Sequence, residues 1–202
     1  MFNPQFIVDS FSGNIGNCVA VAYLKAMLAG KKLFKARLAN NKTTITLQDG
    51  FSITLSQKEI AGLARHAGIS YRRYKDARQR QKLERVKRIT KALFAVLLVR
   101  LQIQKAGDRA LTYVKIKKAL TETGIATKNI HTLFGVKRKP LQRFTNKKIE
   151  AINKKPAVLL VNKKHITFCS FGCFDDFGNP ARIDTAAEKF LYGAPAYYFE
   201  IG

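Results

Sequence analysis

The first clear hydrophobic pattern along the chain is CVAVAYLKAMLA, a stretch that begins at Cys18 and is apolar on almost every side. It carries one charge, Lys25, and Gly30 follows its last residue. A helix that is apolar all round is buried in a protein core. The pattern therefore predicts a buried helix that ends at Gly30. The sequence before it, SGNIGN, is rich in turn residues and places an Asn cap directly ahead of Cys18.

Alternating residues in the next region indicate strands. Thr43–Leu47 and Phe51–Leu55 alternate β-branched and polar residues on either side of Asp49-Gly50, which predicts a β-hairpin. The sequence Ser56-Gln57-Lys58-Glu59 then forms a capping box. It opens a helix that we expect to run through about His66.

A long segment then changes from basic to apolar. Residues from Arg72 to Lys91 include ten Lys and Arg against two acidic residues, and the apolar run Ile89 to Leu101 follows. We expect one helix here, solvated in its first part and buried in its second. Further helices are predicted at Leu111 to Thr123 and at Asn146 to Asn153, before a Lys-Lys-Pro break.

The last quarter of the chain has the pattern of a β-sheet. The predicted elements are a buried strand at Ala157 to Val161, a second strand from His165 to Phe174, a turn at Asp175 to Pro180, and strands at Arg182 to Thr185 and Ala196 to Ile201. Helices followed by antiparallel strands predict an α+β fold. We expect a single domain over 1–202, helical over about 1–155 and β-rich over about 156–202.

The charge is strongly one-sided, with 37 Lys and Arg against 13 Asp and Glu, a net charge of +24. Hydrophobic residues make up 47% of the chain, which is enough for a folded core. Such a charge attracts anionic partners, whether nucleic acid, lipid headgroups, cell-wall polymer or an acidic protein. The charge does not choose among them.

Cysteine usage and hydropathy limit the compartment. The three cysteines are an odd number and Cys18 is far from Cys169 and Cys173, so free thiols in a reducing compartment are expected. The chain has no apolar run long enough for a membrane span, and its first residues lack the pattern of a signal peptide. The expected location is the cytoplasm, or the exterior by a route without a cleavable signal.

Cys18 is the first candidate for chemistry. A thiol at a helix N-terminus lies beside unpaired N–H groups and the positive end of the helix dipole, which favour the nucleophilic thiolate and can bind an oxyanion. The alternative is that Cys18 is a small buried hydrophobic residue.

A thiolate nucleophile also needs a base, and the candidate is His165 at the edge of the predicted sheet. An antiparallel hairpin would return Asp184 beside it, and the alternative for His165 is an ordinary polar residue at a strand edge.

The sequence also contains residues that could form a metal site or a basic binding surface. His165, Cys169 and Cys173 would share one face of a single strand, but no paired CxxC motif accompanies them, so we expect core thiols and neither metal nor cofactor. The basic segment offers an anionic-partner surface at Arg78, Arg80, Lys82 and Arg85. The alternative interpretation of these basic residues is that they form an ordinary solvated helix face.

The order of these features resembles the papain-like cysteine protease superfamily, and the loop before Cys18 is most similar to the calpain type. The hairpin with Asp49-Gly50, the Leu133-Phe134-Gly135 step and the strand leading to His165 also resemble that group. The resemblance implies a papain-like α+β fold with an N-terminal buried helix carrying the Cys, a helical middle and a C-terminal antiparallel sheet. It also implies Cys/His thioester chemistry on an amide bond.

Carried over to this sequence, the resemblance makes Cys18 the nucleophile, His165 the general base and acid, and Asp184 the orienting residue. Ser12 stands at the position of the family's oxyanion Gln, so Ser12, Asn14 or the Cys18 backbone N–H would serve the oxyanion. The implied activities are protease, deamidase, amidase or acyltransferase, with a peptide, protein or other amide substrate. By analogy such a domain suits a bacterial effector or toxin held by an acidic inhibitor protein. The competing hypothesis is a non-catalytic basic module that binds nucleic acid or an acidic protein.

Overall fold

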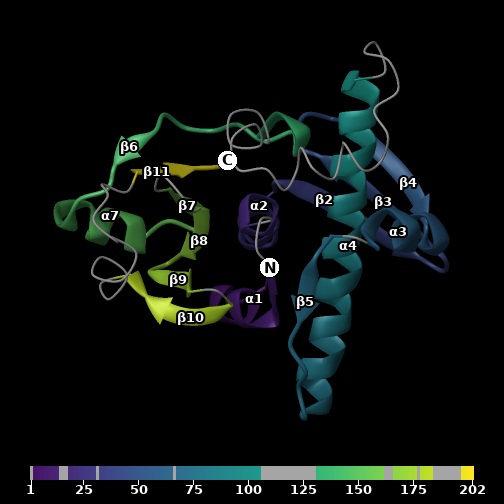
Figure 1. The fold of residues 1–202 in the computed structure, drawn as a ribbon, viewed down its shortest axis with the longest axis horizontal. Coiled ribbons are helices and arrows are strands. Elements are labelled where there is room, and N and C mark those ends of the chain that lie inside the picture. Colours follow the sequence, from purple (N-terminus) through teal and green to yellow (C-terminus); the bar gives the residue numbers. More distant parts are fainter. Residues whose placement is uncertain are drawn as a thin grey trace.

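The computed structural model describes residues 2–13, 18–30, 32–65, 67–105, 131–161, 166–176, 178–183 and 197–202. The fold mixes helices and antiparallel sheets, as the α+β prediction requires. Helix α2 (Cys18–Ala29) lies at the centre, between a sheet on one side and the long helix α4 (Ala77–Lys105) on the other (Figure 1). The described residues also form the helices α1 (Pro4–Ser10), α3 (Gln57–Ala64) and α7 (Ile149–Asn153) and the 3₁₀ turn η1 (Asn146–Lys148).

The strands form three sheets. A two-stranded sheet pairs β1 (Phe11–Gly13) with β5 (Ile69–Tyr71), and a three-stranded sheet has the order β2 (Phe34–Ala39), β3 (Lys42–Leu47), β4 (Ser52–Ser56). The six-stranded sheet has the order β10 (Asn179–Arg182), β9 (Cys173–Asp176), β8 (Ile166–Ser170), β7 (Val158–Val161), β11 (Tyr197–Glu200), β6 (Gln142–Arg143). All strand pairs are antiparallel.

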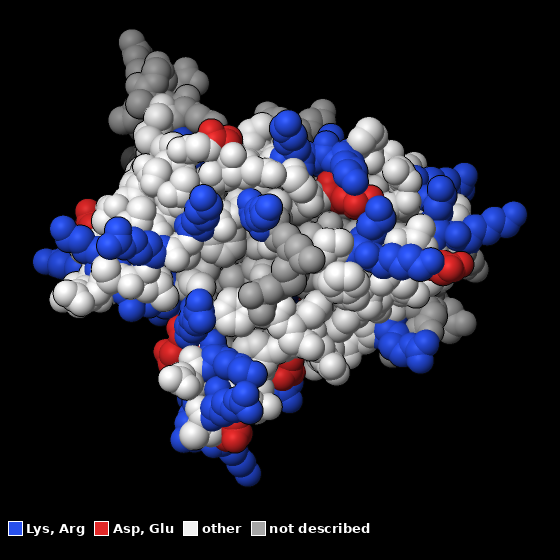
Figure 2. Space-filling model, turned by 180° about the vertical axis from the view of Figure 1, so that it is seen from behind, with Lys and Arg blue, Asp and Glu red and all other residues white. Residues whose placement is uncertain are grey.

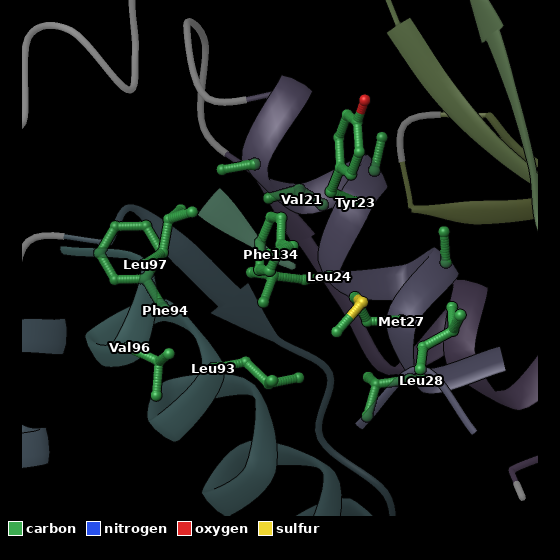
Figure 3. Packing of buried hydrophobic residues seen from close by; sticks show 14 of the residues in the cluster. Val21, Tyr23, Leu24, Met27, Leu28, Leu93, Phe94, Val96, Leu97 and Phe134 are labelled. Atoms are coloured by element: carbon green, nitrogen blue, oxygen red, sulfur yellow. The ribbon is translucent and has the colours of Figure 1, made fainter. Parts of the chain in front are cut away.

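Helix α2 is buried as its pattern predicts. Every residue from Val19 to Ala29 is buried, including Lys25. One side of α2 packs on β8 and β7, and another packs on the buried half of α4. Figure 3 shows side chains such as Leu24 and Met27 of α2 beside Leu93 of α4. Helix α2 therefore contacts both the six-stranded sheet and α4 and lies within the main core.

The local signals in the first half of the chain are confirmed. The predicted hairpin is the pair β3 and β4, and the capping box at Ser56 and Glu59 opens α3. Strand β2, which the pattern did not predict, adds a third strand beside β3. The long helix begins at Ala77, later than expected, because Asp76 caps its start: the Asp76 Oδ1 accepts a hydrogen bond from the Gln79 backbone N–H at 2.7 Å.

The C-terminal predictions are confirmed for β7 and β11 and wrong for the strands and the turn between them, where β10 (Asn179–Arg182) lies earlier than the strand predicted at Arg182 to Thr185. The single strand predicted from His165 to Phe174 is two strands, β8 and β9, joined by a turn at Phe171 and Gly172. Both turn residues have positive φ, 46° and 76°. The helix predicted at Leu111 to Thr123 lies outside the described residues. Among the helices of the described ranges, none is both long and apolar enough to cross a bilayer.

Candidate active site at the start of helix α2

Cys18 differs from the rest of its helix in exposure. It is the first residue of α2 and is partly exposed, whereas the residues that follow it in the helix are buried. Its side chain packs against the edge of the main core. The N–H groups of a first helical turn have no partners within the helix, and the helix dipole is positive there. Cys18 is therefore partly accessible at a helix end whose free N–H groups can donate to an oxyanion.

Ser12, the first oxyanion candidate, lies in β1, where it pairs with Ser70. Ser12 also lies against Gly178 in the turn between β9 and β10, since a Cβ built on Gly178 would come within 2.8 Å of the Ser12 Cβ. Gly178 has a φ of 91°, a conformation that glycine adopts without strain. This close approach holds the start of the Cys18 loop against one end of the six-stranded sheet. Asn14, the second oxyanion candidate, lies outside the described residues.

His165 lies outside the described residues, whereas the strand that follows it in the sequence, β8, is described. Ile166, its neighbour in the chain, begins β8 and pairs with Val161. Strand β8 packs directly on α2. The ladder between β8 and β9 pairs Cys169 with Phe174, so β8 begins at the end of the sheet where Gly178 meets Ser12.

Asp184 also lies outside the described residues, so its assigned role stays a prediction. The hairpin used to choose it is different in the structure, because β10 pairs with β9 and not with β8. The backbone N–H of Ile183 donates to the carbonyl of Gly172 at 2.8 Å. Ile183 therefore lies near the end of β8, whereas His165 precedes its start.

The expectation that Asp175 and Asp176 lie in a solvated turn is wrong for Asp175. Both residues belong to β9, and Asp175 is 8% exposed. Its Oδ2 accepts a hydrogen bond from Lys25 Nζ at 2.7 Å, and its Oδ1 accepts one from the Gly178 backbone N–H at 2.6 Å. The Asp175 carboxylate thus joins the β9–β10 turn to the central helix.

Lys25 is the residue at this site that the sequence analysis did not assign. It is fully buried in α2, and its Nζ also donates to the Val8 carbonyl at 3.0 Å and lies 5.1 Å from the centre of the Phe11 ring. Burial lowers the pKa of Lys25, and the attraction of Asp175 opposes that shift. The signal was present in the sequence, because a single charge in an apolar helix requires a buried partner.

The structure separates the two late cysteines, which the single-strand prediction had placed on one face. Cys169 pairs with Val158 and Phe174 and packs with them in the second core cluster, whereas Cys173 packs against the main core on the opposite face. Burial raises the pKa of Cys169 to about 12 and also raises that of Cys173, where Asp175 adds to the shift. In the described ranges, no group of three or more His, Cys, Asp or Glu residues could hold a metal ion.

The residues of the predicted anionic-partner surface are all exposed on the first half of α4, which projects from the body of the protein (Figures 1 and 2). They are Arg78, Arg80, Lys82 and Arg85. Two of them make local contacts, Arg80 with the Lys75 carbonyl at 2.6 Å and Arg85 with the Phe2 ring at 5.9 Å. The surface is therefore available to a partner.

Comparisons of the chain with protein-family models, with curated proteins and with solved structures find no match.

Proposed function

We propose that this protein is a papain-like thiol hydrolase or acyltransferase that acts on an amide bond through a thioester at Cys18. The observation that carries the proposal is the partly exposed Cys18 at the start of a helix whose following residues are all buried. A cysteine retained for packing alone would be expected to share that burial. The position of Cys18 supports a role at the surface of the active site.

The proposed reaction follows from the residue types. The Cys18 thiolate attacks the carbonyl carbon, forming a C–S bond, and the C–N bond then breaks as His165 gives a proton to the departing amine. Water or another acceptor next attacks the thioester, with His165 removing its proton, and the C–S bond breaks to release the product and return the Cys18 thiolate. The Cys18 backbone N–H, with Ser12 or Asn14, would bind the oxyanion. Asp184 is the candidate for orienting the His165 ring, but its neighbour Ile183 lies near the end of β8 opposite to Ile166, so this role needs its own test. No metal or cofactor takes part in this scheme.

The strand ends support the pairing of Cys18 with His165. Ile166, which follows His165 in the sequence, begins β8 at the end nearest Gly178. Ser12, six residues before Cys18, contacts Gly178 at that same end. Ser12 precedes the proposed nucleophile in the sequence, and Ile166 follows the proposed base. Both Ser12 and Ile166 therefore lie at the same end of the six-stranded sheet.

The proposal is tested by measuring how fast iodoacetamide alkylates each cysteine at pH 7, with peptide mass spectrometry as the readout. We expect Cys18 to react first, because it is partly exposed and because the raised pKa values of Cys169 and Cys173 leave little thiolate. The variant His165→Ala should slow alkylation at Cys18 and leave Cys173 unchanged. A Cys18 that reacts no faster than glutathione, or ignores the loss of His165, would contradict the proposal.

The role of Asp184 as the residue that orients His165 is tested with a separate pair of variants. Asp184→Ala should slow Cys18 alkylation as His165→Ala does, because both members of the unit act through the same ring. Asp176→Ala serves as the control for a lost carboxylate. Asp175→Ala is unsuitable here, since it also removes the partner of Lys25. A rate that falls with Asp176→Ala but not with Asp184→Ala would reject Asp184.

The second candidate function is a non-catalytic basic module, favoured by the exposed basic face of α4 (Figure 2). If this face binds nucleic acid, affinity for a single-stranded oligonucleotide should fall steeply with salt. Reversing Arg78, Arg80, Lys82 and Arg85 to Glu should lower the salt slope by about 1 for each lost phosphate contact. Strong binding of this kind combined with an unreactive Cys18 would favour the module over the enzyme.

A peptide, a protein or another amide would be the substrate under the main proposal. The charge of +24 also suits an acidic inhibitor protein, as expected for an effector or toxin domain. A reducing compartment, which would keep the three cysteines as thiols, is part of the same proposal.

A further inference from the structure

The apolar layer of the three-stranded sheet extends beyond the elements that cover it. On β3 the core-facing residues Ile45 and Leu47 are 1% and 3% exposed. Their partners on β2 lie on the same face, since Ala36 pairs with Ile45 and Phe34 with Leu47, yet Ala36 is exposed and Phe34 is only partly buried. The core therefore ends between β3 and β2.

A groove of about 600 Å³ lies along this uncovered face of β2. Its apolar lining includes Phe34, Ala36 and Leu38 of β2, Leu28 of α2 and Ile89 of α4. Arg85 also lines the groove and adds positive charge. The volume is in the range of protein pockets that bind ligands, about 300–1,000 Å³.

Strand β2 is also an edge strand. It pairs with β3 and, within the described ranges, with no other strand. Its opposite face carries Lys35 and Arg37, both exposed. Charges of this kind often protect a sheet edge from unwanted pairing, but they do so without an apolar groove beside the same strand. The groove and the edge together provide backbone partners, apolar contacts and positive charge along one strand.

We propose that β2 is a docking site for an extended acidic segment of a partner protein, which adds to the sheet as a further strand. Side chains alternate between the two faces of a strand, so a segment of alternating apolar and acidic residues would place apolar groups in the groove and carboxylates beside Lys35 and Arg37. Backbone pairing at a sheet edge supplies affinity, and the alternating pockets supply specificity. The proposal is independent of Cys18.

The test uses a capped octapeptide that alternates valine and glutamate, with binding measured by calorimetry. A peptide of the same composition with all valines before all glutamates is the control for charge alone. We expect the alternating peptide to bind at least about tenfold more tightly, equivalent to about 1.4 kcal/mol. Equal binding of the two peptides would overturn the proposal.

Two pairs of variants locate the site. Ala36→Asp puts a negative charge into the groove and should weaken peptide binding about tenfold, as loss of one central contact does. The control Ala61→Asp makes the same change on the exposed face of α3 and should not weaken binding. Lys35→Glu should weaken binding, and Lys58→Glu on α3 should not. Circular dichroism checks folding, and the lysine pair decides the test if Ala36→Asp does not fold.

Two other occupants are distinguished by the same variants. A dimer of the protein that Ala36→Asp abolishes would show that a second copy fills the groove. An oligonucleotide whose binding depends on Ala36, with no binding of the alternating peptide, would assign the groove to nucleic acid. Either result would overturn the proposal.

Discussion

The six-stranded sheet and the three-stranded sheet bury their apolar residues differently. Strands β7 and β8 are apolar on both faces, because the main core, which includes Leu159, covers one face and the second cluster, which includes Val158, covers the other. The three-stranded sheet has one apolar face, and the part on β2 remains uncovered. A charge on the doubly buried sheet must find its partner inside, as Asp175 does with Lys25, whereas Lys35 and Arg37 stay in water. Substitution of a charged or apolar side chain should therefore change the unfolding free energy much more in the six-stranded sheet than on β2.

The largest effect is expected from Asp175→Ala, which leaves the buried Lys25 without its partner. Breaking a buried ion pair in this way costs about 3–5 kcal/mol of unfolding free energy. Asp176→Ala is the control, since Asp176 is the next residue on β9 and is partly exposed. Urea unfolding followed by circular dichroism measures both, and equal losses would contradict the role given to the pair.

Matched leucine substitutions compare the sheets directly. Leu159→Ala on β7, where Leu159 is fully buried, should lower the unfolding free energy by about 3 kcal/mol. Leu38→Ala on β2 should cost about 1 kcal/mol, because that side chain is already partly in water. Similar losses at both positions would show that β2 is covered in solution.

Removing both partners of the ion pair should cost less than removing one. We expect Lys25→Met with Asp175→Leu to lose about 1–2 kcal/mol, since no unpaired charge remains and only hydrogen bonds such as that to Gly178 are lost. A double variant as unstable as Asp175→Ala would contradict this account.

The pH dependence of the same pair has a definite sign. Burial lowers the pKa of Lys25 in the folded state, so the unfolded chain binds more protons between that value and the ordinary 10.5. Unfolding free energy therefore rises with pH in this window. The stability of the wild type relative to the double variant should increase as the pH approaches 10.5, and a decrease would contradict the direction of the shift.

The smallest effect on stability is expected on the exposed half of α4. Lys82→Glu should change the unfolding free energy by no more than about 0.5 kcal/mol, because that side chain lies in solvent. Thermal unfolding of the variant checks this. A larger loss would mean that the basic face of α4 packs against another part of the protein.

Local sequence signals determined several elements of this fold. The apolar pattern of α2, the Asp-Gly hairpin of β3 and β4 and the capping box at Ser56 depend on neighbours a few residues apart, and all three are present in the structure. The position of Cys18 at a helix start was predictable for the same reason. His165 and Asp184 lie outside the described residues, so their roles stay predictions.

Only the tertiary structure decided the division of β8 from β9. Residues from His165 to Phe174 alternate well enough for one strand, and the turn at Phe171 places a large residue at positive φ, which local preference disfavours. Pairing of β9 with β8 and of Asp175 with Lys25 stabilises that turn, and these contacts join residues far apart in the chain. Sequence patterns report preferences over a few residues, whereas strand register and buried ion pairs depend on which distant segments pack together.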